Sequence, residues 1–302
     1  GEPLGKHRHH AVREVHRVAA LLRLAVELAA GRDVVGDIRD RDSMRKAFKG
    51  ADVVFHLGAL IAIPYSYDAP QSYIAANIEG TLNILELARD NGLSRVVHTS
   101  TSEVYGTARY VPIDEQHPLI GQSPYSASKI GADKMAESYH LSFGLPLVTV
   151  RPFNTFGPRQ SARAVIPTII TQALVGREIK LGSLSPTRDL NYVADTAEGF
   201  MRLAACDAAI GKVVNLGSGS EISIADLARL ICQLAGSKLA AVADSARIRP
   251  AASEVERLVA DVTLARSLTG WTSTVGLEEG LRRTIAWFRE NMRYYRPGEY
   301  MK

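Results

Sequence analysis

Residues 95–106 read R-V-V-H-T-S-T-S-E-V-Y-G, an apolar run that passes into hydroxyl groups, a carboxylate and a glycine. The run Arg95–Thr99 has the length and the valine content of a buried parallel strand. Similar runs occur at Val53–Leu57, Leu145–Arg151 and Lys212–Leu216. Glu103 and the hydroxyl groups beside it therefore follow the carboxyl end of a strand, where open α/β sheets bind their ligands.

Helical patterns separate most of these four runs. They cover Asp42–Lys49, Gln71–Asn91 and Pro124–Phe143. Ser123 precedes a proline at the start of the third helix, which is typical of a helix N-terminus. Strands that alternate with helices predict an α/β fold with a doubly wound parallel sheet of the Rossmann type.

Beyond Pro152 the pattern changes to helices separated by loops rich in Gly, Pro and Ser. These helices are expected near Ala162–Val175, Ile224–Ala235 and Leu277–Glu290. The change predicts a smaller C-terminal lobe that binds substrate over the carboxyl ends of the strands. We expect a dinucleotide-binding domain at 33–157 plus 189–217, and a substrate-binding lobe at 158–188 plus 218–302. Residues 1–32 form an atypical N-terminal segment.

The composition narrows the class of protein. Of the 302 residues 46% are hydrophobic and 23% are charged, and the net charge is +4. No stretch reaches the roughly 20 apolar residues of a membrane span, and no nucleic-acid-binding signature occurs, so neither partner is expected. The two cysteines, Cys206 and Cys232, lie in apolar helical patterns. They indicate neither a disulfide framework nor a metal site, and they suit a reducing cytoplasm.

Tyr125 and Lys129 stand four residues apart, so both side chains project from one face of a helix. A free tyrosine has a pKa near 10, and a neighbouring ammonium favours its phenolate form. The pair therefore predicts a proton acceptor for a substrate hydroxyl group. Thr99 or Thr101, at the end of the preceding strand, is expected to add a hydroxyl group to the same site.

Several ordered motifs resemble the extended short-chain dehydrogenase/reductase family that acts on nucleotide sugars. They are T-S-T-S-E-V-Y-G at 99–106, Y-S-A-S-K at 125–129, R-P-F-N-T-F-G-P-R at 151–159 and R-D-L-N-Y-V-A-D at 188–195. The resemblance runs from about residue 33 to the C-terminus. The segments 64–70 and 159–170 are most similar to dehydratases of nucleotide-linked N-acetylglucosamine in legionaminic-type sugar pathways.

The resemblance implies a reaction. In the family's 4,6-dehydratases an acid stands at the position of Glu103, so Glu103 is expected to take the C5 proton. Tyr125 is the expected base for oxidation at C4 by NAD, and Lys129 and Thr101 assist it. The C6 hydroxyl group then leaves as water. Ser102 relays the proton to this leaving group, or Glu103 performs both steps.

The resemblance also implies the contacts of the cofactor, the substrate and a second subunit. Its cofactor positions are Asp37, Ile38, Leu57, Gly58, Ala59, Asn77, Thr99, Tyr125 and Lys129. Its substrate positions, which meet the diphosphate of a nucleotide sugar, are Asn154, Arg159, Arg188 and Arg249. Asp195 is expected to cap the helix that follows it. The family pairs the helices 71–91 and 124–143 in a homodimer.

The N-terminal segment departs from the family, which begins with a strand and a G-x-x-G-x-x-G loop. Before Val34 the glycines are Gly1, Gly5 and Gly31. A truncated or frame-shifted version of a longer gene is the favoured interpretation, and it predicts an unstable chain that binds NAD poorly. The other interpretations are a variant whose N-terminal helix covers the gap, an organelle-targeting segment, and opportunistic metal binding by His7, His9, His10 and His16.

The sequence thus predicts 4,6-dehydration of UDP- or GDP-linked N-acetylglucosamine by an NAD-dependent lyase. One alternative is a nucleotide-sugar 4-epimerase. Another is a non-catalytic or inactive relative that lacks the glycine loop. The base of the nucleotide and the choice between NAD and NADP stay open.

Overall fold

A parallel sheet forms the centre of the computed structural model, which describes residues 34–296. Within this part of the chain the strand order is β1-β2-β3-β7. The strands are β1 (Val53–His56), β2 (Arg95–Thr99), β3 (Leu147–Pro152) and β7 (Val213–Leu216). The predicted α/β fold with a parallel sheet is confirmed. The expectations for residues 1–32 lie outside the described residues.

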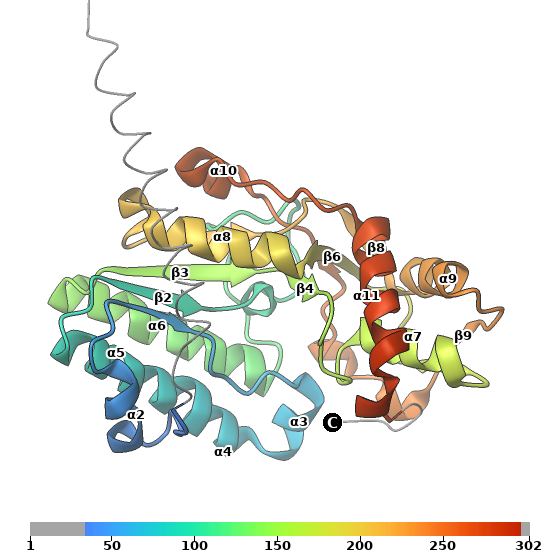
Figure 1. The fold of residues 1–302 in the computed structure, drawn as a ribbon, viewed down its shortest axis with the longest axis horizontal. Helices are drawn as coiled ribbons and strands as arrows, with labels where there is room; N and C mark the ends of the chain where they lie inside the picture. Colours follow the sequence, from blue (N-terminus) through green and yellow to red (C-terminus); the bar gives the residue numbers. More distant parts are fainter. Residues whose placement is uncertain (1–33, 297–302) are drawn as a thin grey trace, which may run out of the picture.

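Helices cover both faces of this sheet (Figure 1). On one face lie α2 (Arg41–Phe48), α5 (Gly80–Asp90) and α6 (Pro124–Phe143), and on the other α8 (Val193–Ala205) and α10 (Thr263–Thr269). Side chains of the first set pack with Val96 and Leu147, and those of the second with Val97 and Val148. Because successive side chains of a strand point to opposite faces, the Val-rich strands supply both cores.

The helix predicted at Gln71–Asn91 differs in its interior. It begins with α4 (Pro70–Tyr73), passes through the π-helical segment η1 (Ile74–Glu79) and continues as α5. Asn77, inside the π segment, is fully buried and hydrogen-bonds both backbone groups of Leu60. Such a bond pattern depends on a loop 17 residues away, so helical periodicity does not show it.

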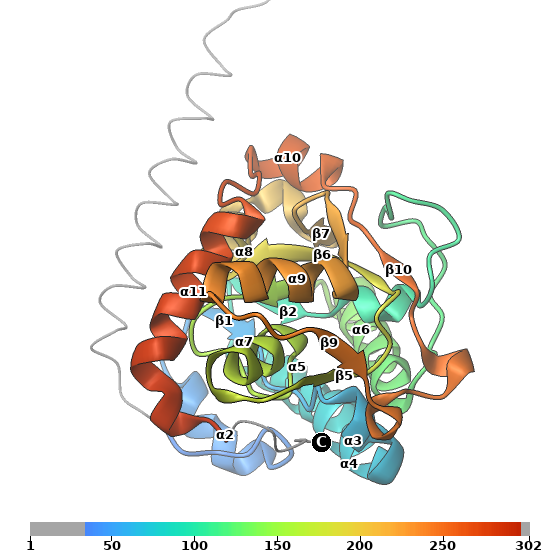
Figure 2. The same ribbon diagram turned by 90° about the vertical axis from the view of Figure 1, so that its right-hand side faces the viewer.

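The C-terminal lobe has its own hydrophobic core. Figure 2 shows the elements of this lobe from their outer side. Its helices are α7 (Val165–Val175), α9 (Ile224–Ala235) and α11 (Leu277–Asn291). Its short strands are β4 (Asn154–Phe156), β6 (Thr187–Tyr192), β8 (Glu221–Ser223) and β10 (Arg257–Leu258), with β5 (Ile179–Leu181) paired to β9 (Ala241–Ala243). Further elements are α3 (Ile63–Asp68), η2 (Ser102–Tyr105), η3 (Asp207–Ala209), η4 (Ser245–Arg247), η5 (Ala251–Ser253) and η6 (Met292–Tyr294). Among the described helices none has the length and apolar content needed to cross a bilayer.

Asp195 ties α8 to the segment before α11. Its carboxylate accepts hydrogen bonds from the backbone N–H groups of Thr274 and Val275, at 3.0 and 2.8 Å. Its own carbonyl oxygen accepts one from the Trp271 indole at 2.8 Å. The expectation that Asp195 caps the helix after it is therefore wrong. It lies in the first turn of α8, and its oxygens meet donors that are distant in sequence.

Gly199 offers a test of the packing between α8 and the sheet. A Cβ atom there would lie 2.6 Å from Leu216 Cδ1 and 3.1 Å from the Trp271 indole nitrogen. We expect Gly199→Ala to lower the free energy of unfolding by about 1–3 kcal/mol, because the core is overpacked. Urea denaturation followed by fluorescence measures this change. Gly276→Ala is the control, since a Cβ there meets nothing within 4 Å. An equal loss in both variants would contradict the prediction.

Candidate active site

The turn after β2 carries the hydroxyl groups and the carboxylate predicted at this strand end. Thr101 is the N-cap of η2, and its side-chain oxygen accepts a hydrogen bond from the Glu103 backbone N–H at 3.2 Å. Ser102 is only 1% exposed, whereas Glu103 is partly exposed. Gly106 ends the turn with a φ of +64°, a conformation that suits glycine. The turn therefore presents Glu103 and buries the residues on either side of it.

The start of α6 brings Tyr125 and Lys129 to the same strand end. Ser123 and Ser126 form a capping box, and Pro124 occupies the first turn. Both predicted residues are buried, and Lys129 Nζ donates a hydrogen bond to the Thr99 carbonyl oxygen at 2.7 Å. The Thr101 hydroxyl group hydrogen-bonds Tyr125. Of the two threonines considered, Thr101 contacts the tyrosine, while the Thr99 hydroxyl group is buried without a partner among the described residues.

The electrostatics of the pair differ from the simple expectation. Burial raises the pKa of Tyr125, the hydrogen bond from Thr101 opposes this rise, and the charge of Glu103 adds to it. Burial also lowers the pKa of Lys129 to about 8, and the charge of Asp133 opposes this change. Lys129 by itself therefore does not bring the tyrosine into the neutral range. Proton transfer to Tyr125 requires a further favourable contact with the phenolate form.

Strand β6 supplies the basic side of the site. Successive strand residues point to opposite faces, so Arg188 and Asp189 have different surroundings. The charge of Glu103 acts on Arg188, whose pKa is lowered by burial and raised by that carboxylate. Asp189 is fully buried and accepts hydrogen bonds from the backbone N–H groups of Ser218, Gly219 and Ala260 at 2.7–3.0 Å. Asp189 thus anchors the loops on the other side of the strand that carries Arg188.

Arg188 and Arg249 share one carboxylate. Both guanidinium groups lie 3.5 Å from Glu254 Oε1, and the Arg188 and Glu254 side chains are 8% and 11% exposed. The two arginines predicted to bind the diphosphate therefore lie together, an arrangement that suits a group with several anionic oxygens.

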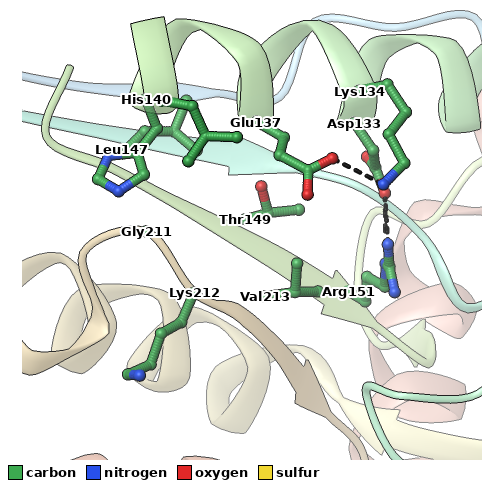
Figure 3. Close-up of a pocket in the computed structure, with 11 residues that line it drawn as sticks. Asp133, Lys134, Glu137, His140, Leu147, Thr149, Arg151, Gly211, Lys212 and Val213 are labelled. Carbon is green, nitrogen blue, oxygen red and sulfur yellow. Dashed lines mark hydrogen bonds and ion pairs between the residues drawn. The ribbon is translucent and has the colours of Figure 1, made fainter. Parts of the chain in front are cut away.

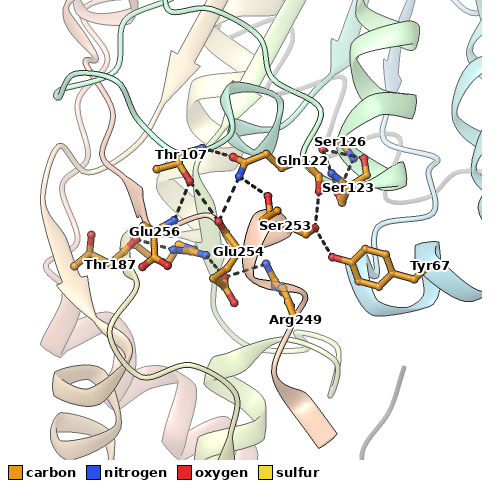
Figure 4. Close-up of polar contacts among 12 residues, drawn as sticks. Tyr67, Thr107, Gln122, Ser123, Ser126, Thr187, Arg249, Ser253, Glu254 and Glu256 are labelled. Atoms are coloured by element: carbon orange, nitrogen blue, oxygen red, sulfur yellow. Dashed lines mark hydrogen bonds and ion pairs between the residues drawn. The ribbon is translucent and has the colours of Figure 1, made fainter. Parts of the chain in front are cut away.

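The loop that carries Arg249 is tied to the base of α6 (Figure 4). Gln122 Nε2 donates to the Glu254 carbonyl oxygen at 3.4 Å, and Thr107 Oγ1 donates to the same oxygen at 3.3 Å. The Ser253 hydroxyl group bonds both the Gln122 carbonyl and the Tyr67 hydroxyl group. These bonds place the loop beside Ser123, two residues before Tyr125.

The other residues predicted to contact the cofactor differ in their surroundings. The Asp37 carboxylate bonds the Arg39 guanidinium, which holds the pKa of Asp37 at about 2. Ile38 packs against Gly58 and Gly80. Leu57 is 65% exposed, and Gly58 and Ala59 follow it at the end of β1.

The side-chain amide of Asn77 forms hydrogen bonds within the chain. Besides both Leu60 bonds, its amide donates to the Ser128 hydroxyl group at 2.9 Å. Of the predicted substrate residues, Asn154 begins β4 and is partly buried. Arg159 is exposed on the following loop with a φ of +66°, and the structure does not bring it to the carboxylate shared by the other two arginines.

Sequence reasoning missed Asp133, Arg151 and Glu254. Asp133 is buried and accepts hydrogen bonds from His98, Ser100 and Arg151. It follows Lys129 by four residues, so a third polar residue on a buried helix face was the available signal. Glu254 had no such signal, because Arg188 lies 66 residues away and Arg249, five residues before it, is not related to it by a helical or strand repeat.

A cavity of about 120 Å³ lies farther along α6, at Asp133 and the residues after it (Figure 3). Its lining includes Glu137, His140, Thr149, Arg151 and Lys212. Neither Tyr125 nor Glu103 lines it. The strand-end site and this cavity are therefore separate features.

Comparison with known proteins agrees with this geometry. The family model described as GDP-mannose 4,6 dehydratase matches residues 8–284. The chain belongs to this family. It is 34% identical to a putative UDP-glucose 4-epimerase from Methanocaldococcus jannaschii, across 86% of this chain and 85% of that protein. It is 31% identical to a dTDP-glucose 4,6-dehydratase from Streptomyces griseus, across 87% of this chain and 79% of that protein.

The solved structures similar to this GDP-mannose 4,6-dehydratase family member include both kinds of protein. A dTDP-glucose 4,6-dehydratase from Streptomyces venezuelae, determined with NAD bound, superposes with a TM-score of 0.82 and 30% identity. The match covers 89% of this chain and 84% of that chain. A UDP-glucose 4-epimerase from Thermotoga maritima, determined with UDP-glucose, gives a TM-score of 0.80 and 27% identity over 85% and 84% of the two chains.

The anchor beneath Arg188 can be tested by Asp189→Asn. The new amide would turn an N–H group toward donors that now meet a carboxylate oxygen, so we expect a loss of about 1–3 kcal/mol in unfolding free energy. Urea denaturation measures the loss. Asp261→Asn is the matched control, because its carboxylate accepts a hydrogen bond from one nearby backbone N–H, that of Thr263. Equal stability of Asp189→Asn and the unaltered chain would refute the anchoring role.

Proposed function

We propose that this chain is an NAD-dependent 4,6-dehydratase of a nucleotide-linked N-acetylhexosamine, with UDP- or GDP-N-acetylglucosamine as substrate. The observation that carries the proposal is the position of Glu103. A partly exposed carboxylate follows β2, and its charge acts on both Tyr125 and Arg188. A 4-epimerase needs one base at C4, whereas a 4,6-dehydratase needs a second group that removes the C5 proton.

The described residues fit NAD at the carboxyl ends of β1 and β2. Leu57 and Ile61 expose 65% and 64% of their surface there, and the buried Thr99 hydroxyl group has no partner in residues 34–296. We propose that Leu57, Gly58, Thr99, Tyr125 and Lys129 hold the cofactor. When bound, NAD would supply the reversible hydride chemistry that the reaction needs, oxidation at C4 and reduction at C6, with no net change in redox state.

Each protein group then has a defined task. Tyr125, bonded to Thr101, takes the proton of the C4 hydroxyl group, and its phenolate is favoured by the cationic Lys129. Glu103 takes the proton from C5, which the C4 ketone acidifies. The C6 hydroxyl group leaves as water with a proton from Glu103 or, through a relay, from Ser102. When the hydride returns to C6, C5 takes up a proton, and this balances the proton that Tyr125 received from the C4 hydroxyl group. The sugar has then lost one molecule of water and keeps a ketone at C4.

The basic side of the site is proposed to hold the diphosphate. Arg188 and Arg249 converge on one carboxylate, and guanidinium groups match phosphate oxygens in geometry and charge. Asn154, at the start of β4, is proposed to hydrogen-bond the same group, and Arg159 lies on the loop that follows. The N-acetylglucosamine moiety rests on the resemblance of segments 64–70 and 159–170 to dehydratases of that sugar.

A second candidate is a nucleotide-sugar 4-epimerase. It is favoured by two relatives at 34% identity, from Methanocaldococcus jannaschii and Mycolicibacterium smegmatis, that are named as a putative and an assigned UDP-glucose 4-epimerase. An epimerase inverts C4 without loss of water. The two activities therefore differ in the mass of the product.

The direct experiment incubates the purified chain with NAD and, separately, UDP- and GDP-N-acetylglucosamine. Mass spectrometry of the sugar nucleotide should show loss of one water for a dehydratase. An isomer of unchanged mass would establish the epimerase instead. Calorimetry with NAD accompanies the assay, and a folded chain that binds neither NAD nor either nucleotide sugar would overturn both candidates.

Glu103→Gln separates the roles of the two bases. We expect dehydration to fall by about 10²–10⁴-fold, since the amide cannot accept the C5 proton, while NAD binding is retained. Tyr125→Phe should abolish the oxidation at C4, the step that precedes the one assigned to Glu103. Glu290→Gln, at an exposed carboxylate near the end of α11, is the control and should react like the unaltered chain. Full dehydratase activity in Glu103→Gln would remove the assigned role.

We also propose that the chain acts in the cytoplasm as a homodimer formed through the helical run 70–90 and α6. Both cysteines are buried thiols, as suits a reducing compartment. Ile74 and Leu141, on these helices, are 43% and 75% exposed. Analytical ultracentrifugation at micromolar concentration should give twice the chain mass, and a monomer would refute the pairing.

A further inference from the structure

Three ionisable residues follow one another along one buried face of α6. Tyr125, Lys129 and Asp133 are spaced by four residues, and they are 7%, 3% and 4% exposed. The first two belong to the proposed catalytic site. The third lies one helical turn deeper, and nothing in the proposed reaction uses it.

The Asp133 carboxylate is held on both oxygens. Oδ1 lies 3.1 Å from His98 Nε2, and Oδ2 accepts hydrogen bonds from Ser100 Oγ at 2.8 Å and from Arg151 Nη2 and Nε at 3.0 and 3.2 Å. His98, Ser100 and Arg151 are each at most 4% exposed. The carboxylate is therefore fixed in position by donors from β2, the residue after it and β3. Figure 3 shows Asp133 above Arg151, joined to it by an ion pair.

The charges around Lys129 make Asp133 distinctive. The titratable groups packed about this part of α6 are His56 of β1, His98 of β2, Arg151 of β3, Tyr73 of α4, Glu103 and Tyr105 of η2, and Tyr125 of α6 itself. Burial lowers the pKa of both histidines, so they are neutral at pH 7. Of the two carboxylates, Glu103 acts on Tyr125 and Arg188, whereas Lys129 and Arg151 share Asp133.

We propose that Asp133 is a positioning residue whose fixed negative charge keeps Lys129 in the ammonium form, hydrogen-bonded to the Thr99 carbonyl oxygen and able to support the Tyr125 phenolate. This inference rests on the proposed function for its catalytic consequence. Its electrostatic part concerns the folded chain alone. Asp133 acts through Lys129 and does not touch substrate or cofactor.

The direction of the effect follows from the surroundings of Lys129. Burial lowers its pKa to about 8, and the charge of Asp133 is the opposing influence. Removal of that charge lowers the pKa further and leaves Arg151 as an uncompensated neighbour. Because an amine cannot support the phenolate by charge, activity should be lost as the pH rises through the pKa of Lys129. The alkaline limb of the pH–rate profile therefore moves to lower pH without Asp133.

The experiment titrates the Lys129 side-chain nitrogen by ¹⁵N NMR in the full chain, with the signal assigned by Lys129→Arg. In Asp133→Asn we expect the ratio of ammonium to amine at fixed pH to fall at least about tenfold, and in Asp133→Glu to recover most of this loss. Tyr105→Phe is the matched control. It removes a hydroxyl group 3.1 Å from Arg151 and 2.7 Å from Asn215 but changes no formal charge, so the Lys129 titration should stay unchanged.

Two further measurements complete the test. Arg151→Gln removes the competing cation, so the Lys129 pKa should rise in it, and this variant serves if Asp133→Asn does not fold. The pH profile of kcat for dehydration should shift its alkaline limb in Asp133→Asn and keep it in Tyr105→Phe. An unchanged Lys129 titration in a folded Asp133→Asn or Arg151→Gln overturns the proposal. A chain that shows the titration shift but no turnover refutes the proposed function and leaves the electrostatic role established.

Discussion

The hydrogen bond from the Lys129 ammonium to the Thr99 carbonyl oxygen is the contact on which the geometry of the site depends. At 2.7 Å it joins α6 to the carboxyl end of β2. The turn that carries Glu103 leaves β2 directly after this point, and Tyr125 lies one helical turn from Lys129. One buried contact thus brings the Glu103 carboxylate and the Tyr125 phenol to the same site, although they come from different elements of the fold.

The central sheet could be predicted because its strands carry their signal locally. Short Val-rich runs between amphipathic helices mark buried parallel strands, and β2 was predicted to the residue. The strands of the C-terminal lobe could not be predicted in this way. β10 has two residues, and its pairing with β6 depends on a partner about 70 positions away. Such short strands form only through pairing with a neighbouring strand, and two or three residues are too few to show the alternation of apolar and polar side chains that predicts a strand.

The site residues show the same difference between local signals and dependence on distant parts of the chain. Tyr125 and Lys129 were predictable from spacing, since a helix alone brings them together. Asp133 was missed because a carboxylate on a helix is ordinarily solvated, and its burial depends on Arg151 and His98 from two strands. Asn77 and Asp37 were expected to contact the cofactor, and both side chains form hydrogen bonds with other groups of the chain that the sequence did not reveal. Asn77 bonds Leu60 and Ser128, and Asp37 bonds Arg39.

The shared carboxylate of Glu254 has a consequence for selectivity. Arg188 and Arg249 are not isolated cations, because each guanidinium group lies 3.5 Å from the Glu254 carboxylate. Binding of the proposed diphosphate would therefore exchange one anionic partner for another rather than neutralise free cations. A monoanion such as chloride gains little from this exchange, whereas a group with several charged oxygens can satisfy both guanidinium groups at once. Under the proposed function, the Glu254 carboxylate would thus favour ligands with several charged oxygens over singly charged competitors.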